Sequence, residues 1–128
     1  MNTDEHRLKL NAITEKIIGC AFQVSSTLGC GFLEKVHENA LAIEMRKSNM
    51  EVLQQHNVQV HYGNNVVGEY TADLLVEQEI LVELKATKAL DEIHTAQCLN
   101  YLKANGFKTC LLLNFGRPKL EMKRIIND

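Results

Sequence analysis

The chain has 128 residues, of which 45% are apolar and 23% charged, as expected for one globular domain covering residues 1–128. A formal net charge of −2 excludes a protein that binds nucleic acid through overall positive charge, so any such contact needs a local basic patch. The four cysteines form no CxxC pair, the apolar runs are too short to span a membrane, and the first residues are polar; together these features predict a cytoplasmic protein with reduced thiols.

Two helices are expected at the start of the chain. Apolar residues recur at three- and four-residue steps from Leu10 to Val24, which places them on one helix face. Gly29 and Gly31 then end the pattern, because glycine readily takes the positive φ found at helix ends. A second helix is expected over residues 33–47, and its buried residues are expected to be Val36, Ala40 and Ile43.

After residue 50 the apolar period changes to that of strands. Gly63-Asn64-Asn65 marks a turn, Gly68 marks a candidate bulge, and Asn105-Gly106 ends a helix. The expected strands cover residues 52–62, 66–76, 80–85, 109–115 and 120–126, and the expected helix covers residues 90–104. The order ααβββαββ predicts an α/β fold with a mixed sheet flanked by helices, built from an antiparallel three-stranded meander and a helical crossover.

Three charged residues interrupt the expected strands. Asp73 lies in a run that is otherwise suited to a buried strand, although ionised carboxylates are rarely buried without a partner or a metal. Glu83 and Lys85 are two residues apart and therefore share one face of the next strand, while the apolar residues occupy the other. The residues alone leave open an ordinary alternative, in which Asp73 is solvated and the other two lie on a half-exposed strand.

The turn between these two strands predicts their register. If it is centred on Gln78, Val76 lies opposite Ile80 and Asp73 lies opposite Glu83, with Cβ atoms about 5 Å apart. Two carboxylates at that distance repel unless a cation lies between them or one takes up a proton. Mg²⁺ suits one or two carboxylates plus a phosphate. Lys85, on the same face, is then placed to assist an attacking water or to stabilise charge on the phosphate.

The pattern Asp73…Glu83-Leu84-Lys85 resembles the signature of the PD-(D/E)xK nuclease superfamily, and other segments resemble its bacterial GxxExxY group. The similarity runs from about Ile13 to Ile125. His37 stands where the motif has tyrosine, and Cys30 where proline is more familiar. The matching segments are residues 28–37 (LGCGFLEKVH), 70–76 (YTADLLV), 97–102 (QCLNYL) and 113–116 (LNFG). The resemblance implies a restriction-endonuclease-like core and Mg²⁺- or Mn²⁺-dependent hydrolysis of phosphodiester bonds.

The resemblance also implies roles for residues outside the strands. Glu34, near the start of the second helix, would bind the metal with Asp73 and Glu83 or orient its water, although a carboxylate there also simply favours the helix dipole. Gln97 would position the nucleophile or the substrate. The resemblance also implies a supporting layer around these residues, which would not bind the metal itself and would contain Tyr101, His94 and His37.

Nucleic acid is the expected partner, with DNA favoured and RNA left open. The candidate basic patch is formed by Arg117, Lys119, Lys123 and Arg124, which are otherwise residues of a solvated edge strand. Two alternatives keep the fold without autonomous catalysis. One is a binding or protein-interaction module, and the other is a nuclease subunit that works as a homodimer or with a partner chain.

Overall fold

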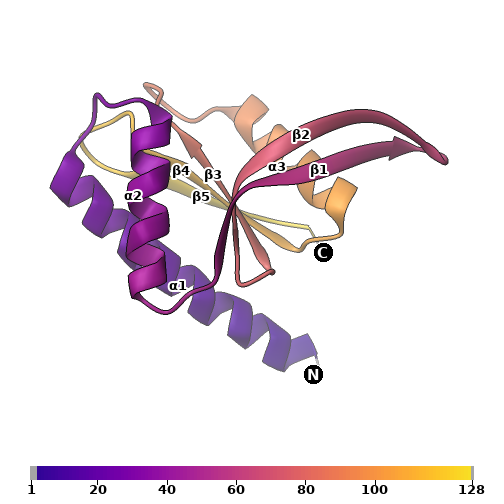
Figure 1. Ribbon diagram of the computed structural model, residues 1–128, viewed down its shortest axis with the longest axis horizontal. Coiled ribbons are helices and arrows are strands. Elements are labelled where there is room, and N and C mark those ends of the chain that lie inside the picture. The colour runs from indigo at the N-terminus through magenta and orange to yellow at the C-terminus, as the bar shows by residue number, and fades with distance from the viewer. Residues whose placement is uncertain (1–2, 128) are drawn as a thin grey trace.

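The computed structural model describes residues 3–127, and the elements within them follow the expected order (Figure 1). The helices are α1 (Thr3–Leu28), α2 (Glu34–Lys47) and α3 (Glu92–Asn105). The strands are β1 (Val52–Tyr62), β2 (Asn65–Val76), β3 (Ile80–Lys85), β4 (Thr109–Asn114) and β5 (Glu121–Ile126). The first helix is longer at both ends than its apolar stripe predicts.

The five strands form one mixed sheet in the order β1-β2-β3-β4-β5. All neighbouring pairs are antiparallel except β3 and β4, which are parallel and are connected through α3. A register shift follows the Val60–Gly68 pair, where His61 pairs with Val66 and leaves an extra residue in β2. The predicted meander, helical crossover and bulge near Gly68 are therefore confirmed.

Helices cover the sheet on both faces. α1 and α2 pack on one face, where the core includes Ile80, Val82 and Leu84 of β3. α3 packs on the other face, where the core includes Leu81. Because side chains alternate along a strand, Glu83 lies on the α3 side, beside the apolar residues of that layer. The alternation predicted for β3 is therefore confirmed, and it buries a carboxylate inside the fold.

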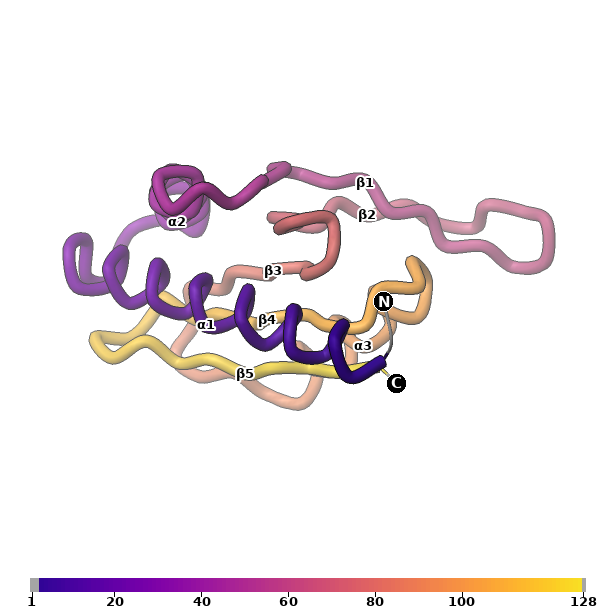
Figure 2. Tube along the Cα trace, turned by 90° about the horizontal axis from the view of Figure 1, so that it is seen from below, coloured from indigo at the N-terminus to yellow at the C-terminus, as the bar shows by residue number. Residues whose placement is uncertain are grey.

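The far half of the β1–β2 hairpin extends beyond the helices, as both Figure 1 and Figure 2 show. From Gln59 to Glu69 every side chain is exposed. The near half joins the body of the sheet, where Val52, Leu74 and Val76 are buried. The hairpin thus leaves the sheet between these two halves, close to Asp73.

The buried face of α2 differs from the prediction. Val36 and Ile43 are 39% and 58% exposed, and Ala40 is only partly buried. The residues that face the core are His37, Glu38, Leu41, Ala42 and Met45. The prediction was wrong because it ranked residues by hydrophobicity, whereas His37 and Glu38 are buried through polar contacts.

Alanine substitutions should distinguish the buried face of α2 from its exposed face by their effects on stability. Leu41 is fully buried, so Leu41→Ala should lower the free energy of unfolding by about 2–5 kcal/mol. Ile43→Ala is the matched control and should change it by less than about 0.5 kcal/mol, because more than half of that side chain is already in water. Urea denaturation measures both values. Equal losses, or a larger loss at Ile43, would contradict this packing of α2.

Candidate active site

Strands β2 and β3 pair over only three residues on each side. The pairs are Val76–Ile80, Leu75–Leu81 and Leu74–Val82, which confirms the register predicted from the turn at Gln78. The next residues outward are Asp73 and Glu83, and no further backbone pair joins the two strands. The two carboxylates therefore lie where the strands separate.

Side chains take over the cross-strand bonding at this point. The backbone N–H of Asp73 donates to Glu83 Oε1 at 3.2 Å, and the backbone N–H of Leu84 donates to Asp73 Oδ2 at 2.8 Å. Each carboxylate thus accepts a hydrogen bond from the opposite strand. This reciprocal pair of bonds fixes the two acidic groups against each other, even though the backbone ladder has ended.

Burial makes both groups difficult to ionise. Glu83 is only 7% exposed, and burial together with the nearby Asp73 carboxylate raises its pKa to about 9. Burial also raises the pKa of Asp73, with further contributions from Glu38 and Glu34, while the hydrogen bond from Leu84 opposes the rise. In the absence of a cation, the pair therefore holds a proton at neutral pH.

Lys85 lies two residues beyond Glu83 and is half-buried. Its positive charge lowers the pKa of both acidic groups, against the larger effect of burial. Within the described residues Lys85 forms no salt bridge to either carboxylate, so its ammonium group is not held by them. Its backbone is well anchored, because its carbonyl accepts a hydrogen bond from Phe115 N–H at 2.8 Å.

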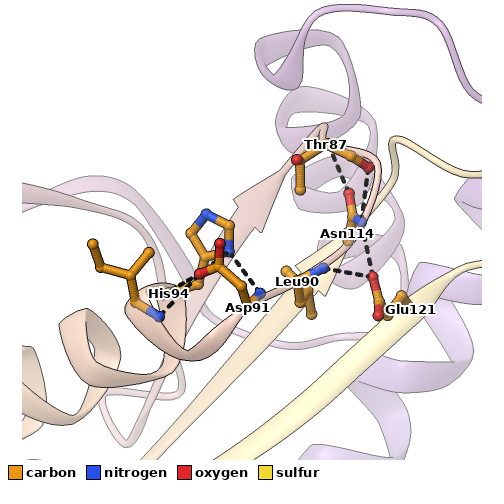
Figure 3. Close-up of polar contacts among 7 residues, drawn as sticks. Thr87, Leu90, Asp91, His94, Asn114 and Glu121 are labelled. Carbon is orange, nitrogen blue, oxygen red and sulfur yellow. Dashed lines mark hydrogen bonds and ion pairs between the residues drawn. The ribbon is translucent and has the colours of Figure 1, made fainter.

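The loop after Lys85 is fixed by the amide of Asn114 (Figure 3). Asn114 is fully buried and uses its whole hydrogen-bonding capacity. Its Oδ1 accepts from the N–H groups of Thr87 and Gly116, and its Nδ2 donates to the Thr87 carbonyl and to Glu121 Oε1, all within 2.9–3.0 Å. A Cβ at Gly116 would lie 2.3 Å from Thr87 N, so the loop packs directly on a backbone without a side chain.

The start of α3 is held in the same region of the fold (Figure 3). Glu121 Oε1 also accepts from Leu90 N–H at 3.0 Å. Asp91 caps the helix by accepting from the N–H groups of Ile93 and His94, while His94 Nδ1 accepts from Asp91 N–H in return. The whole connection from Lys85 to α3 is thereby tied to the end of the sheet.

The model of the PD-(D/E)XK nuclease superfamily matches residues 11–125, nearly the whole chain, so the match includes Asp73, Glu83 and Lys85. The chain belongs to this superfamily. This confirms the superfamily that the sequence motifs resemble. The narrower GxxExxY group stays a prediction. The chain matches no curated protein sequence.

Two solved structures are similar in fold. The crystal structure of SSO0001 has a TM-score of 0.57 at 14% identity, with 95% of this chain and 62% of that chain covered. An alkaline exonuclease (LHK-Exo) from Laribacter hongkongensis has a TM-score of 0.47 at 16% identity, with 73% and 56% covered. This chain spans less than two thirds of either structure. At such identities, the similarity to SSO0001 concerns the fold alone, and it agrees with the restriction-endonuclease-like core.

Among the expected site residues on α3, Tyr101 lies close enough to the acidic pair to be affected by its charge. The ring of Tyr101 stacks on Tyr70 with centroids 3.6 Å apart, and both phenol pKa values are raised by burial and by the nearby Glu83. Gln97, one turn before Tyr101, is exposed and makes no hydrogen bond within the described part of the chain. His94, by contrast, is committed to the helix cap.

Two glutamates of α2 act on Asp73 through space. Both raise its pKa, and the effect of Glu38 is larger than that of Glu34. Glu34 is exposed at the first position of the helix, as expected from the sequence. Glu38 is only 3% exposed and was missed, although a carboxylate two residues before the run Ala40-Leu41-Ala42 could have signalled it.

His37, at the position of the motif tyrosine, is fully buried against the sheet. Its ring stacks on Phe115 at 4.6 Å, and its Nε2 lies 2.8 Å from the carbonyl oxygen of Gly29. These contacts tie the loop before α2 to the end of β4. These are packing contacts, and a supporting role of His37 behind the site stays a prediction.

The expected basic patch does not form one surface. Lys123 lines a pocket of about 260 Å³ with residues of the α3 side, whereas Arg124 bonds Asn11 of α1 on the opposite side of the sheet. Arg117 lies 3.9 Å from Glu121 in an ion pair, and Lys119 is exposed in the preceding turn. Adjacent residues of a strand point to opposite faces, so Lys123 and Arg124 lie on different sides of the sheet. A nucleic-acid contact by these basic residues stays a prediction.

The carboxylates of Asp73 and Glu83 are suitable ligands for a hard divalent cation, although they are only two side chains. No hydrogen bond from the described residues reaches the second oxygen of Asp73 or Glu83, and two carboxylates with phosphate and water oxygens suit Mg²⁺. Over residues 3–127, no group of three or more acidic, histidine or cysteine side chains is placed to hold a metal ion. Glu34 therefore does not complete a three-residue set in this conformation.

The raised pKa of Glu83 predicts how stability depends on pH without metal. Between pH of about 5 and 9 the folded protein holds a proton that the unfolded chain releases, so the free energy of unfolding falls as pH rises. Glu83→Gln cannot ionise and should be more stable than the parent at pH 8.5 by about 1 kcal/mol or more, with little difference at pH 4.

Urea denaturation in EDTA at several pH values measures this difference. Glu15→Gln, an exposed glutamate of α1, is the matched control and should follow the parent curve. A parent protein whose stability difference from Glu83→Gln is constant from pH 5 to 9 would contradict the burial of an acidic pair.

Proposed function

We propose that the protein is a metal-dependent nuclease that hydrolyses phosphodiester bonds of nucleic acid, with DNA as the first substrate to test. The observation that carries this proposal is the placement of the Asp73 and Glu83 carboxylates side by side where β2 and β3 separate. Asp73 N–H donates to Glu83 Oε1 at 3.2 Å and Leu84 N–H donates to Asp73 Oδ2 at 2.8 Å. Superfamily membership supports the same chemistry. A structural role alone would not require two acidic groups that oppose each other's ionisation.

Asp73 and Glu83 would hold Mg²⁺ or Mn²⁺ through the oxygens that face away from the backbone bonds. The cation would supply Lewis-acid activation of the phosphate and of an attacking water. Glu34, exposed at the start of α2, would orient that water or complete the coordination after substrate enters. Because Glu83 is protonated at neutral pH, loading the site would release a proton from this side chain.

Lys85 and Gln97 would act on the substrate. The Lys85 ammonium group is on the same face of β3 as Glu83, where it would stabilise charge that develops on the phosphate. Gln97, exposed on α3, would donate to or position a phosphate oxygen or the nucleophile. The anchored loop between Lys85 and α3 would keep the positions of Lys85 and Gln97 fixed relative to each other.

The wider substrate surface is expected to come from elsewhere than the split basic residues of β5. We propose that a second copy or a partner chain contributes to this surface. We also propose that the protein belongs to the GxxExxY group. Its proposed location is the cytoplasm. Among residues 3–127, no helix is both long enough and apolar enough to cross a membrane.

Divalent cations should stabilise the folded protein. A ligand that binds only the native state raises the free energy of unfolding, by about 1.4 kcal/mol at a tenfold excess over Kd. Because the cation displaces a proton from Glu83, the rise in Tm with Mg²⁺ or Mn²⁺ should be larger at pH 8.5 than at pH 6.5. Asp73→Asn should lose the response. Equal Tm values in Mn²⁺ and EDTA at both pH values would count against a metal site.

Lys85→Met should separate catalysis from binding. Removing a group that stabilises the charged transition state typically costs about 10²–10³ in rate, with a smaller effect on ground-state binding. We therefore expect cleavage of single-stranded, duplex or branched DNA to fall by at least that factor, with Mn²⁺ response and DNA affinity kept. Lys88→Met, an exposed lysine of the following loop, is the matched control. Equal cleavage by Lys85→Met and the parent would contradict this role, and binding without cleavage by both would favour a binding module.

A further inference from the structure

In the β1–β2 hairpin, the two faces of both strands exchange at the level of Asp73. In β2, Leu74 and Val76 belong to the core under α1 and α2, whereas Ala72 belongs to the core under α3. In β1, Val52 belongs to the first core and Val58 to the second. Regular alternation would keep even-numbered residues of one strand on one face. Both strands therefore reverse their faces between these positions.

The reversal is centred on Gln55 and Asp73. The ladder contains the pairs Gln54–Leu74 and His56–Ala72, but the pair between them is missing. Gln55 has a φ of 59°, which lies in the left-handed region, whereas no residue of β2 has a positive φ. The distortion thus originates in β1, at the residue opposite Asp73. A residue with a Cβ takes this conformation at a disadvantage of roughly 5–30-fold, so something must hold it there.

The carboxylate of Glu38 holds Gln55 in place. Glu38 Oε1 accepts from Gln55 Nε2 at 2.8 Å. Its Oε2 accepts from Gln54 Nε2 at 2.7 Å and from Lys35 Nζ at 3.0 Å. Hydrogen bonds to a buried carboxylate are among the strong ones in proteins, and Glu38 itself lies on the rigid scaffold of α2. One side chain therefore grips two successive residues of β1.

We infer that Glu38 and Gln55 are positioning residues for Asp73. They hold Gln55 in its left-handed conformation, which we call the kink in β1, and this forces β2 to exchange its faces as well. The exchange brings the Asp73 carboxylate between β2 and β3, within 2.8 Å of Leu84 N. In a regular ribbon, Asp73 would instead project from one face of the sheet. The catalytic consequence of this device rests on the proposed function, but the device itself does not.

The contacts of Glu38 favour this indirect role over direct coordination of a cation. Both of its oxygens are already occupied by amide or ammonium donors of Lys35, Gln54 and Gln55. Glu34, in contrast, is exposed and has no such donors among the described residues. The two glutamates of α2 thus have different roles: Glu38 binds side chains of β1, and Glu34 stays available to the proposed metal site.

Substitutions of Gln55 test the kink without touching Asp73. Valine is β-branched and opposes a positive φ, so Gln55→Val should straighten β1. Glycine accepts a positive φ freely, so Gln55→Gly should keep most of the kink. The readout is exchange of the Leu84 amide proton, measured by NMR in EDTA. Protection should fall by roughly 5–30-fold in Gln55→Val and far less in Gln55→Gly, while the Leu112 amide in β4 stays protected in both.

A second pair of variants tests Glu38. Glu38→Gln brings extra N–H groups against the amides of Gln54 and Gln55, so it should lower Leu84 protection and Mn²⁺ affinity together, the latter by roughly tenfold. Adding Gln55→Gly should restore part of both. If Gln55→Val does not fold, Gln55→Ala provides the same contrast more mildly.

Unchanged Leu84 protection in Gln55→Val, or in Gln55→Ala where that replaces it, would overturn the inference. So would a Glu38→Gln protein that loses Mn²⁺ affinity while Leu84 stays protected, because Glu38 would then act as a ligand. The amide measurement needs neither metal nor substrate. A protein without nuclease activity would therefore refute the proposed function and leave this test intact.

Discussion

The separation of β2 from β3 places two acidic side chains next to each other inside an otherwise apolar sheet. Asp73 and Glu83 lie one step beyond the last backbone pair, where each accepts a hydrogen bond from the other strand. Burial and mutual repulsion disfavour their ionisation, and the raised pKa of Glu83 expresses that conflict. A protein retains such a pair at a cost in stability, and a bound cation removes the repulsion.

The rest of the fold keeps the pair from relaxing. On the α3 side, the Asn114 amide and Gly116 fix the loop that follows Lys85. On the α2 side, Glu38 grips the strand opposite Asp73. Apolar layers cover both faces of β3 and β4, so neither strand can move away without exposing core. The acidic groups are thus held by rigid elements from two sides, as a preorganised site requires.

Much of this arrangement could be predicted from local patterns. The alternation in β3 identified the face that carries Glu83, and the turn at Gln78 gave the register, because both depend only on neighbouring residues. The buried face of α2 could not be found in this way. His37 is buried by stacking on Phe115, and Glu38 by amides of β1, so their environments come from residues distant in the chain.

For the basic residues of β5, strand alternation alone already predicts a division between the two faces of the sheet. Lys123 and Arg124 are adjacent in a strand and must point to opposite faces. The reversal of the β1–β2 ribbon, in contrast, has no local signal. Gln55 is not a residue type that favours positive φ, and the bond that we infer to hold it comes from Glu38 on α2, which is distant in the chain.

In the proposed site, Asp73 and Glu83 bind one divalent cation together. Anomalous diffraction from crystals soaked in Mn²⁺ at pH 8.5 would locate that cation. We expect an anomalous peak about 2.0–2.3 Å from one oxygen of each carboxylate, with the peak lost in Asp73→Asn. A fully occupied Mn²⁺ site elsewhere, or the two carboxylates on opposite faces of the sheet with no peak between them, would contradict it.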